Sequence, residues 1–147
     1  LMIWKNNLYT ELIQSLTEKD ILPGILNLLT NLKKNNIKTA IASASKNAPM
    51  ILEKLGILDY FDVIIDPTTL KNGKPFPDIF LAAALELGYN TSEMIGIEDS
   101  EAGIRSINDA KMFSVGVGKL AEADYLVSNT SLLLFENIDK AFNFYNK

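Results

Sequence analysis

Two adjacent acids, Glu98 and Asp99, directly follow a short apolar run, Met94–Ile97, and precede the small-residue pair Ala102–Gly103. Neighbouring carboxylates repel each other and lose much hydration when buried, so at the end of a buried strand they usually share a cation. The alternative is that Asp99 caps the helix that follows, while Glu98 lies on the surface. A capping box would add Glu or Gln three residues after the cap, and neither occurs there.

The chemistry open to these acids is limited because the chain contains no histidine and no cysteine. This excludes a Ser-His-Asp triad, a cysteine nucleophile and a thiolate zinc site. A metal site must then use oxygen ligands, which favour magnesium, calcium or manganese over zinc or copper. Two carboxylates at a strand end suit an oxygen-ligated Mg²⁺ ion.

Small hydroxyl residues follow another apolar run, in the order Ser43, Ala44, Ser45, Lys46 and Asn47. Such residues between a strand and a helix expose backbone N–H groups, and the helix dipole favours an anion there. The Ser43 hydroxyl could donate a hydrogen bond to a phosphate oxygen, and the last two residues could extend the site. The alternative is an ordinary helix N-cap by Ser45 or Asn47.

A third polar group is Lys74, which lies between Gly73 and Pro75 in a loop stiffened by two prolines. A flexible ammonium on a rigid loop is a good counter-charge for a phosphoryl oxygen. The alternative is a solvated surface lysine. Together, the hydroxyl, the lysine and the acid pair predict a pocket for magnesium-assisted phosphoryl transfer.

The elements that position these groups alternate between strands and helices. Apolar runs predict strands at 37–42, 62–66, 94–97, 113–118 and 124–127. Helical spacing predicts helices at 2–18, 25–36, 48–56, 78–88 and 100–110, and one helix or two short ones at 131–146. Because the strands are continuously apolar, we expect an α/β fold with a parallel sheet and helices on both faces. Ligands of such sheets bind at the carboxyl ends of the strands, where the three polar groups lie.

Composition narrows the class of protein further. The net charge is −4 and there is no long basic cluster, so we expect no nucleic-acid partner. No apolar run approaches the length that crosses a bilayer, and the first residues lack the features of a signal peptide. We therefore expect a cytoplasmic protein without a membrane partner.

The motifs and their order resemble those of the haloacid dehalogenase superfamily of phosphotransferases. The sequences IASAS (41–45), KPFPD (74–78) and IGIEDSEAGI (95–104) match its second, third and fourth motifs, and the likeness extends over most of 5–118. The resemblance implies a three-layer Rossmann-like core. It also implies that Ser43 hydrogen-bonds the transferred phosphoryl group, that Lys74 neutralises its charge, and that Glu98 and Asp99 hold or orient Mg²⁺.

Within the superfamily, the likeness is to members that convert β-D-glucose 1-phosphate to glucose 6-phosphate. This reaction proceeds through β-glucose 1,6-bisphosphate and an aspartyl-phosphate enzyme, and the segment Ser43–Asn47 would contact the second phosphate of the bisphosphorylated sugar. Two alternatives stay open. One is a related phosphatase that acts on sugar phosphates, and the other is a truncated domain without catalytic activity.

The sequence differs from the superfamily at the first motif, Asp-x-Asp-Gly, because no Asp-x-Asp occurs among the 147 residues. That motif supplies the nucleophilic and the acid–base aspartates. We expect residues 1–18 to be the last helix of a mostly missing helical cap, 19–23 a hinge, and 24–147 a core domain that lacks its central first strand. That strand would lie between those at 37–42 and 94–97.

Without the central strand, two apolar strands would present unpaired backbone groups to each other. We therefore expect the 147 residues alone to be poorly stable or to aggregate. A complementing N-terminal segment or a second protomer could supply the strand. A monomer of these residues that unfolds cooperatively would contradict this expectation.

Overall fold

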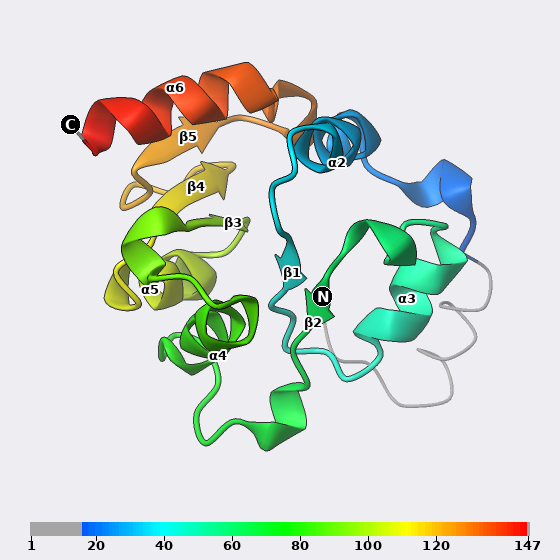
Figure 1. Ribbon diagram of the computed structural model, residues 1–147, viewed down its shortest axis with the longest axis horizontal. Helices are drawn as coiled ribbons and strands as arrows, with labels where there is room; N and C mark the ends of the chain where they lie inside the picture. The colour runs from blue at the N-terminus through cyan, green and yellow to red at the C-terminus, as the bar shows by residue number, and fades with distance from the viewer. Residues whose placement is uncertain (1–15, 147) are drawn as a thin grey trace.

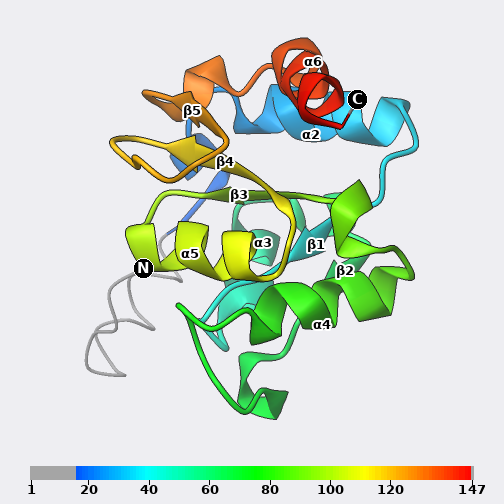
Figure 2. The ribbon, with the colours of Figure 1, turned by 90° about the vertical axis from the view of Figure 1, so that its left-hand side faces the viewer.

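In the computed structural model, which describes residues 16–146, short strands lie between two layers of helices (Figures 1 and 2). Figure 2 shows α2 (Ile25–Lys34) and α6 (Phe135–Tyr145) above the strands, and α4 (Asp78–Leu87) and α5 (Glu101–Asp109) below them. The helix α3 (Ala48–Lys54) packs beside the first two strands through its buried Leu52. The predicted three-layer α/β fold is confirmed.

All strand pairs in the described residues are parallel, as the apolar runs predict. The strands are β1 (Ala40–Ile41), β2 (Val63–Ile64), β3 (Ile95–Glu98), β4 (Phe113–Val117) and β5 (Tyr125–Val127). One sheet pairs β1 with β2, and the other has the order β3-β4-β5. The first two strands are shorter than predicted, because the hydrogen-bonded ladder between them joins only two residue pairs.

The two sheets are not joined to each other by a ladder in the described part of the chain. Among the described residues, β1, β2, β3 and β5 therefore each carry one edge without a strand partner. Ile97 in β3 is 40% exposed, and Ile37, shortly before β1, is 43% exposed. The expectation that the strands at 37–42 and 94–97 flank a further strand stays a prediction, because β2 and β5 carry an open edge as well. The low stability expected of the chain by itself stays a prediction.

Apolar cores on the two faces of the larger sheet hold the layers together. Below it, Ile104 and Ile107 of α5 are buried against α4, including Phe80. Above it, Val115 of β4 is fully buried among side chains of α2 and α6. The apolar side chains of β4, Phe113, Val115 and Val117, all enter this upper core, whereas the alternate positions are the small residues Ser114 and Gly116.

The predicted helices at 25–36, 48–56, 78–88 and 100–110 are all present. Gly56 and Gly88, with φ of 75° and 79°, end two of them in the left-handed conformation that favours glycine. Single 3-10 turns connect the elements, at Glu18–Asp20, Leu58–Tyr60, Pro67–Thr69, Thr91–Glu93 and Thr130–Leu132. The tail thus forms one short turn and one helix, α6.

The helix predicted at 2–18 lies almost wholly outside the described residues. Its last residues, from 16 onward, enter the 3-10 turn Glu18–Asp20 instead of continuing a helix. The domain boundaries expected at 18 and 23 stay predictions. Across residues 16–146, no helix has the length and apolar character needed to cross a membrane.

Candidate functional site

The ammonium group of Lys74 forms an ion pair with Glu98, with Nζ 2.6 Å from Oε2. Both side chains are largely buried, at 19% and 11% exposure. The same ammonium lies 5.4 Å from the ring centroid of the buried Phe80, where the ring face attracts a cation. The interpretation of Lys74 as a solvated surface lysine is therefore wrong.

Glu98 uses both of its carboxylate oxygens. While Oε2 accepts from Lys74, Oε1 accepts from the Asp99 backbone N–H at 3.0 Å and from the Ser100 hydroxyl at 3.3 Å. Burial raises the pKa of Glu98, but the hydrogen bond and charge of Lys74, together with the hydrogen bonds from Asp99, hold the pKa below its ordinary value. For Glu98, the cation that the sequence called for is thus a lysine 24 positions earlier.

Asp99 has the opposite electrostatic environment. Asp99 is more exposed than Glu98, but it is still partly buried. This loss of hydration, together with the hydrogen bond and negative charge of Glu98, raises the pKa of the Asp99 carboxyl group. Ser100 is the N-cap of α5, because its hydroxyl accepts from the Gly103 N–H at 3.0 Å. The capping alternative for Asp99 is therefore wrong.

The donor set at this strand end suits a hard divalent cation. Lys74 is paired with Glu98, so the adjacent Asp99 adds a negative charge that this lysine does not pair. Carboxylate oxygens are the ligands that such a cation prefers. Within residues 16–146, no group of three or more acids lies close enough to hold a metal ion. Glu98 and Asp99 can therefore supply only part of a magnesium coordination shell.

The loop that carries Lys74 is fixed on both sides. A turn is closed by the Phe76 N–H, which donates to the Gly73 carbonyl at 3.0 Å. Upstream, the backbone N–H and side-chain amide of Asn72 donate to Asp78 Oδ2 at 3.1 and 3.4 Å. Downstream, the buried Ser106 hydroxyl of α5 donates to the Phe76 carbonyl at 2.6 Å.

Sequence reasoning missed the roles of Ser106, Asp78 and Phe80 at this site. Asp78 could have been found, because it closes the KPFPD motif and precedes a helix. The contact from Ser106 to Phe76 spans 30 positions, and no local pattern indicates it. The sequence predicts only that Phe80 lies in a helix, because its contact with Lys74 depends on how the loop folds back.

The segment Ser43–Asn47 forms a pair of nested turns after β1. The Ser43 hydroxyl accepts from the Ser45 N–H at 3.1 Å, and the Ser45 hydroxyl accepts from the Asn47 N–H at 3.2 Å. Asn47 is the N-cap of α3 by position, but its side chain makes no capping hydrogen bond. Because the Ser43 oxygen accepts a backbone proton, its own O–H can still donate to a ligand.

The structure brings together some of the predicted site residues and not others. Lys74, Glu98 and Asp99 form one connected group. Among the described residues, Ser43 shares no hydrogen bond with any of these three. Ala44 and Lys46 are exposed on the turns. The structure thus contains two polar groups, one after β1 and one after β3.

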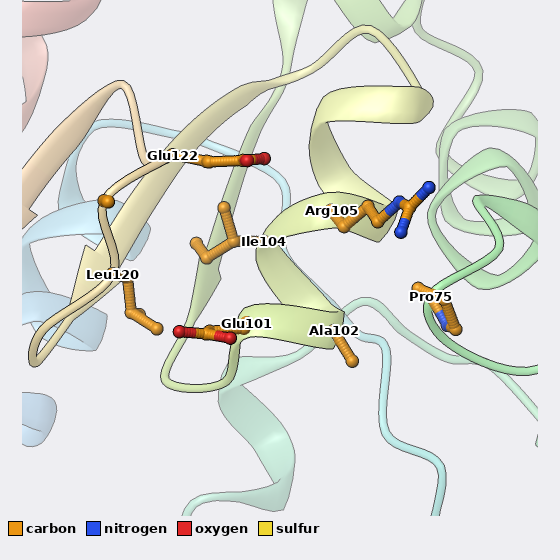
Figure 3. Close-up of a pocket in the computed structure, with 8 residues that line it drawn as sticks. Pro75, Glu101, Ala102, Ile104, Arg105, Leu120 and Glu122 are labelled. Carbon is orange, nitrogen blue, oxygen red and sulfur yellow. The ribbon is translucent and has the colours of Figure 1, made fainter.

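A pocket of about 420 Å³ opens between α5 and the residues Leu120–Glu122 that follow β4 (Figure 3). It lies next to the N-terminal half of α5, with Pro75, the neighbour of Lys74, on one side. Figure 3 shows Ile104 between Glu101 and Glu122, and Arg105 on the side of Pro75. The two carboxylates and the single guanidinium that line this pocket leave it with an excess of negative charge.

The model of the haloacid dehalogenase-like hydrolase family matches residues 3–111, and the chain belongs to this family. Among curated relatives, it is 49% identical to the β-phosphoglucomutase of Bacillus subtilis strain 168, over 99% of this chain and 66% of that protein. It is also 35% identical to the fructose-1-phosphate phosphatase of Escherichia coli, over 51% of this chain and 40% of that protein.

The crystal structure of β-phosphoglucomutase from Clostridium difficile superimposes with a TM-score of 0.94 at 51% identity, covering 96% of this chain and 65% of that one. The chain thus spans just under two thirds of the length of both β-phosphoglucomutases. It is similar to these mutases along almost its entire length. Its likeness to the sugar-phosphate phosphatase is partial.

Proposed function

We propose that the protein containing this chain is a phosphotransferase of the β-phosphoglucomutase type. It would convert β-D-glucose 1-phosphate to glucose 6-phosphate through β-glucose 1,6-bisphosphate. The observation that supports this most strongly is the buried Lys74–Glu98 pair beside Asp99, at a strand end that an anionic group and a hard cation can share. The likeness to two β-phosphoglucomutases over nearly the whole chain favours the mutase over a phosphatase.

Lys74 would neutralise the charge of the phosphoryl group. Its ammonium has three N–H donors, so it can keep its bond to Glu98 and still donate to a phosphoryl oxygen. In a site from which water is largely excluded, such a contact strengthens as charge develops in the transition state. The Glu98 bond and the Phe80 ring hold the ammonium in place before substrate arrives.

Ser43 would donate a hydrogen bond from its hydroxyl group to the same phosphoryl group, since its oxygen already accepts one from the Ser45 N–H. The turns Ser43–Asn47 would contact the second phosphate of the bisphosphorylated sugar. Among them, the exposed Lys46 brings a positive charge that a solvated phosphate can reach.

Glu98 and Asp99 would hold Mg²⁺, which supplies neutralisation of phosphate charge when it is bound. Asp99 is the better direct ligand, because both oxygens of Glu98 are already engaged by donors. Water, phosphate and carboxylates outside residues 16–146 would complete the shell.

A nucleophile must also be provided. Ser43 does not suit this role, because the chain has no histidine to act as its base. We propose that the nucleophilic and acid–base aspartates of the Asp-x-Asp-Gly motif are carried by a complementing segment, which pairs with the open edges of β1 and β3. This segment would come from a longer polypeptide or a second protomer. A strand at this place would end beside both polar groups.

The function is tested by supplying the protein, in its longest natural form, with β-D-glucose 1-phosphate, Mg²⁺ and a trace of β-glucose 1,6-bisphosphate. Glucose 6-phosphate is measured by a coupled dehydrogenase, and inorganic phosphate is measured in parallel. We expect glucose 6-phosphate in large excess over released phosphate. Release of phosphate as the main product would instead indicate a phosphatase.

Replacing Asp99 with asparagine is expected to raise the Mg²⁺ concentration for half-maximal turnover about 10- to 100-fold. An amide oxygen lacks the charge that attracts a divalent cation, and Glu98 is held by Lys74. A magnesium titration of turnover measures the change. Asp109→Asn, on the exposed side of α5, is the matched control and should leave the titration unchanged. An unchanged titration in Asp99→Asn would remove Asp99 from the metal site.

A further inference from the structure

One face of α5 points into the site at three successive positions. Ser100, Gly103 and Ser106 are spaced three residues apart, so they lie on the same side of the helix. The helix itself is anchored by Ile104 and Ile107, which are 2% and 0% exposed in the core. Because the helix is packed firmly, groups that contact this face are held in fixed positions.

The first two positions contact the acid pair. The Ser100 hydroxyl donates to Glu98 Oε1 at 3.3 Å. Gly103 lies so close to Glu98 that a Cβ built on it would overlap the Glu98 carboxylate. The start of α5 therefore determines where the Glu98 carboxylate lies.

The third position contacts the loop that carries Lys74. Ser106 has no exposed surface, and its hydroxyl donates to the Phe76 carbonyl at 2.6 Å. The N–H of Phe76 closes the turn on Gly73. The backbone of this residue is thus held by its N–H and its carbonyl, two positions after Lys74.

We infer that Ser106 is a positioning residue for Lys74. Its hydroxyl ties the lysine loop to the same helix face that sets Glu98, so that the ammonium and the carboxylate meet at a fixed distance. The hydroxyl is buried and committed to a carbonyl, so it touches neither substrate nor metal. This inference rests on the proposed function, because it concerns the group that would neutralise the phosphoryl charge.

The effect should be on the chemical step. An unpartnered Phe76 carbonyl would let the turn shift, and a charge-stabilising group displaced by about 1 Å can lose on the order of 10²-fold in rate. A contact that strengthens in the transition state affects kcat more than KM. A role confined to folding would instead lower stability and leave the kcat of the folded enzyme unchanged.

The chain offers a matched control in Ser114, the other fully buried serine among the described residues. Its hydroxyl accepts from the Asp124 N–H at 2.9 Å and bonds the Asp124 carboxylate at 3.2 Å, which links β4 to the loop before β5. Ser114→Ala therefore removes a buried hydroxyl without touching the lysine loop.

The experiment compares Ser106→Ala, Ser106→Thr and Ser114→Ala in the longest natural form of the protein. Urea denaturation and steady-state turnover are measured for each. We expect Ser106→Ala to lower kcat about 10- to 100-fold, with KM within about twofold of the wild-type value. Ser114→Ala should keep the wild-type kcat while losing a similar amount of stability. Ser106→Thr, which retains the hydroxyl, should recover most of the turnover.

Two failures can be told apart. If the wild-type protein transfers phosphate and Ser106→Ala retains its kcat, the positioning role is overturned while the proposed function stands. A kcat loss in Ser114→Ala equal to that in Ser106→Ala would also overturn the positioning role. If the wild-type protein transfers no phosphate, the proposed function fails, and the inference fails with it.

Discussion

Replacing Lys74 with alanine is expected to lower turnover on the order of 10²–10³-fold, the effect of removing one charge-stabilising group from a largely dry site. The Lys74 side chain is 19% exposed, and its ammonium is held by Glu98 and the Phe80 ring, so water cannot simply take its place. The loss should appear mainly in kcat, because the contact grows stronger as phosphoryl charge develops. Steady-state kinetics with β-D-glucose 1-phosphate measures it.

The matched control is Lys71→Ala, which removes an exposed lysine from the same loop and should leave turnover unchanged. Lys74→Arg keeps the charge but replaces a compact ammonium with a planar fork, so it should restore only part of the rate. Wild-type turnover in Lys74→Ala would remove this residue from the site.

Lys74→Ala also leaves the Glu98 carboxylate without its cation. That carboxylate is 11% exposed and keeps only the Asp99 N–H and the Ser100 hydroxyl as donors. A charged group that loses a buried partner destabilises the fold by about 1–3 kcal/mol, and water that enters beside it reduces the loss. Turnover should therefore be compared under conditions in which both variants are fully folded.

Substituting Gly103 with alanine is expected to reduce turnover about 10²-fold by displacing Glu98. The new methyl group would overlap Cγ, Cδ and Oε2 of that side chain, and the carboxylate has to move away from Lys74. Overpacking costs about 1–3 kcal/mol, whereas alanine in place of glycine within a helix returns about 1 kcal/mol. The loss of activity should thus be large for a small change in stability.

Gly116→Ala is a suitable comparison for this substitution. The Gly116 backbone is the register partner of Glu98, but the added methyl group would lie against Ala123 and Leu120, which are not part of the Lys74–Glu98 group. Denaturation should show a loss of stability, with turnover close to that of the wild type. An active Gly103→Ala enzyme would show that the position of Glu98 does not limit the reaction.

The order of elements could be predicted from the sequence because each signal for it is local. Gly56 and Gly88 ended helices at the expected places, since a left-handed backbone angle is a property of one residue. The lengths of β1 and β2 could not be predicted, because a strand extends only as far as neighbours provide hydrogen bonds. Apolar character alone does not tell how many neighbours a strand has.

The candidate site was predictable as a set of residues but not as a set of contacts. The acid pair indicates a nearby cation, and the sequence alone favours a metal ion because it places Lys74 only in a distant loop. The structure pairs Lys74 with Glu98 across 24 positions and leaves Asp99 as the carboxylate without that lysine. The N-cap of α5 is Ser100 and not Asp99, because Ser100 precedes the first helical residue and its hydroxyl accepts from the Gly103 N–H.

The lack of a ladder between the two sheets in residues 16–146 has a consequence for local unfolding. β4 is the one described strand with neighbours on both sides, whereas β1 and β2 share a single two-residue ladder. Amide hydrogens of β4 should exchange slowest, and those of β1 and β2 with much less protection. The Lys74–Glu98 contact spans this boundary, since its lysine follows β2 and its glutamate ends β3. If the proposed function holds, turnover depends on the less protected sheet, and a segment that pairs with both sheets would order the fold and the Lys74–Glu98 contact together.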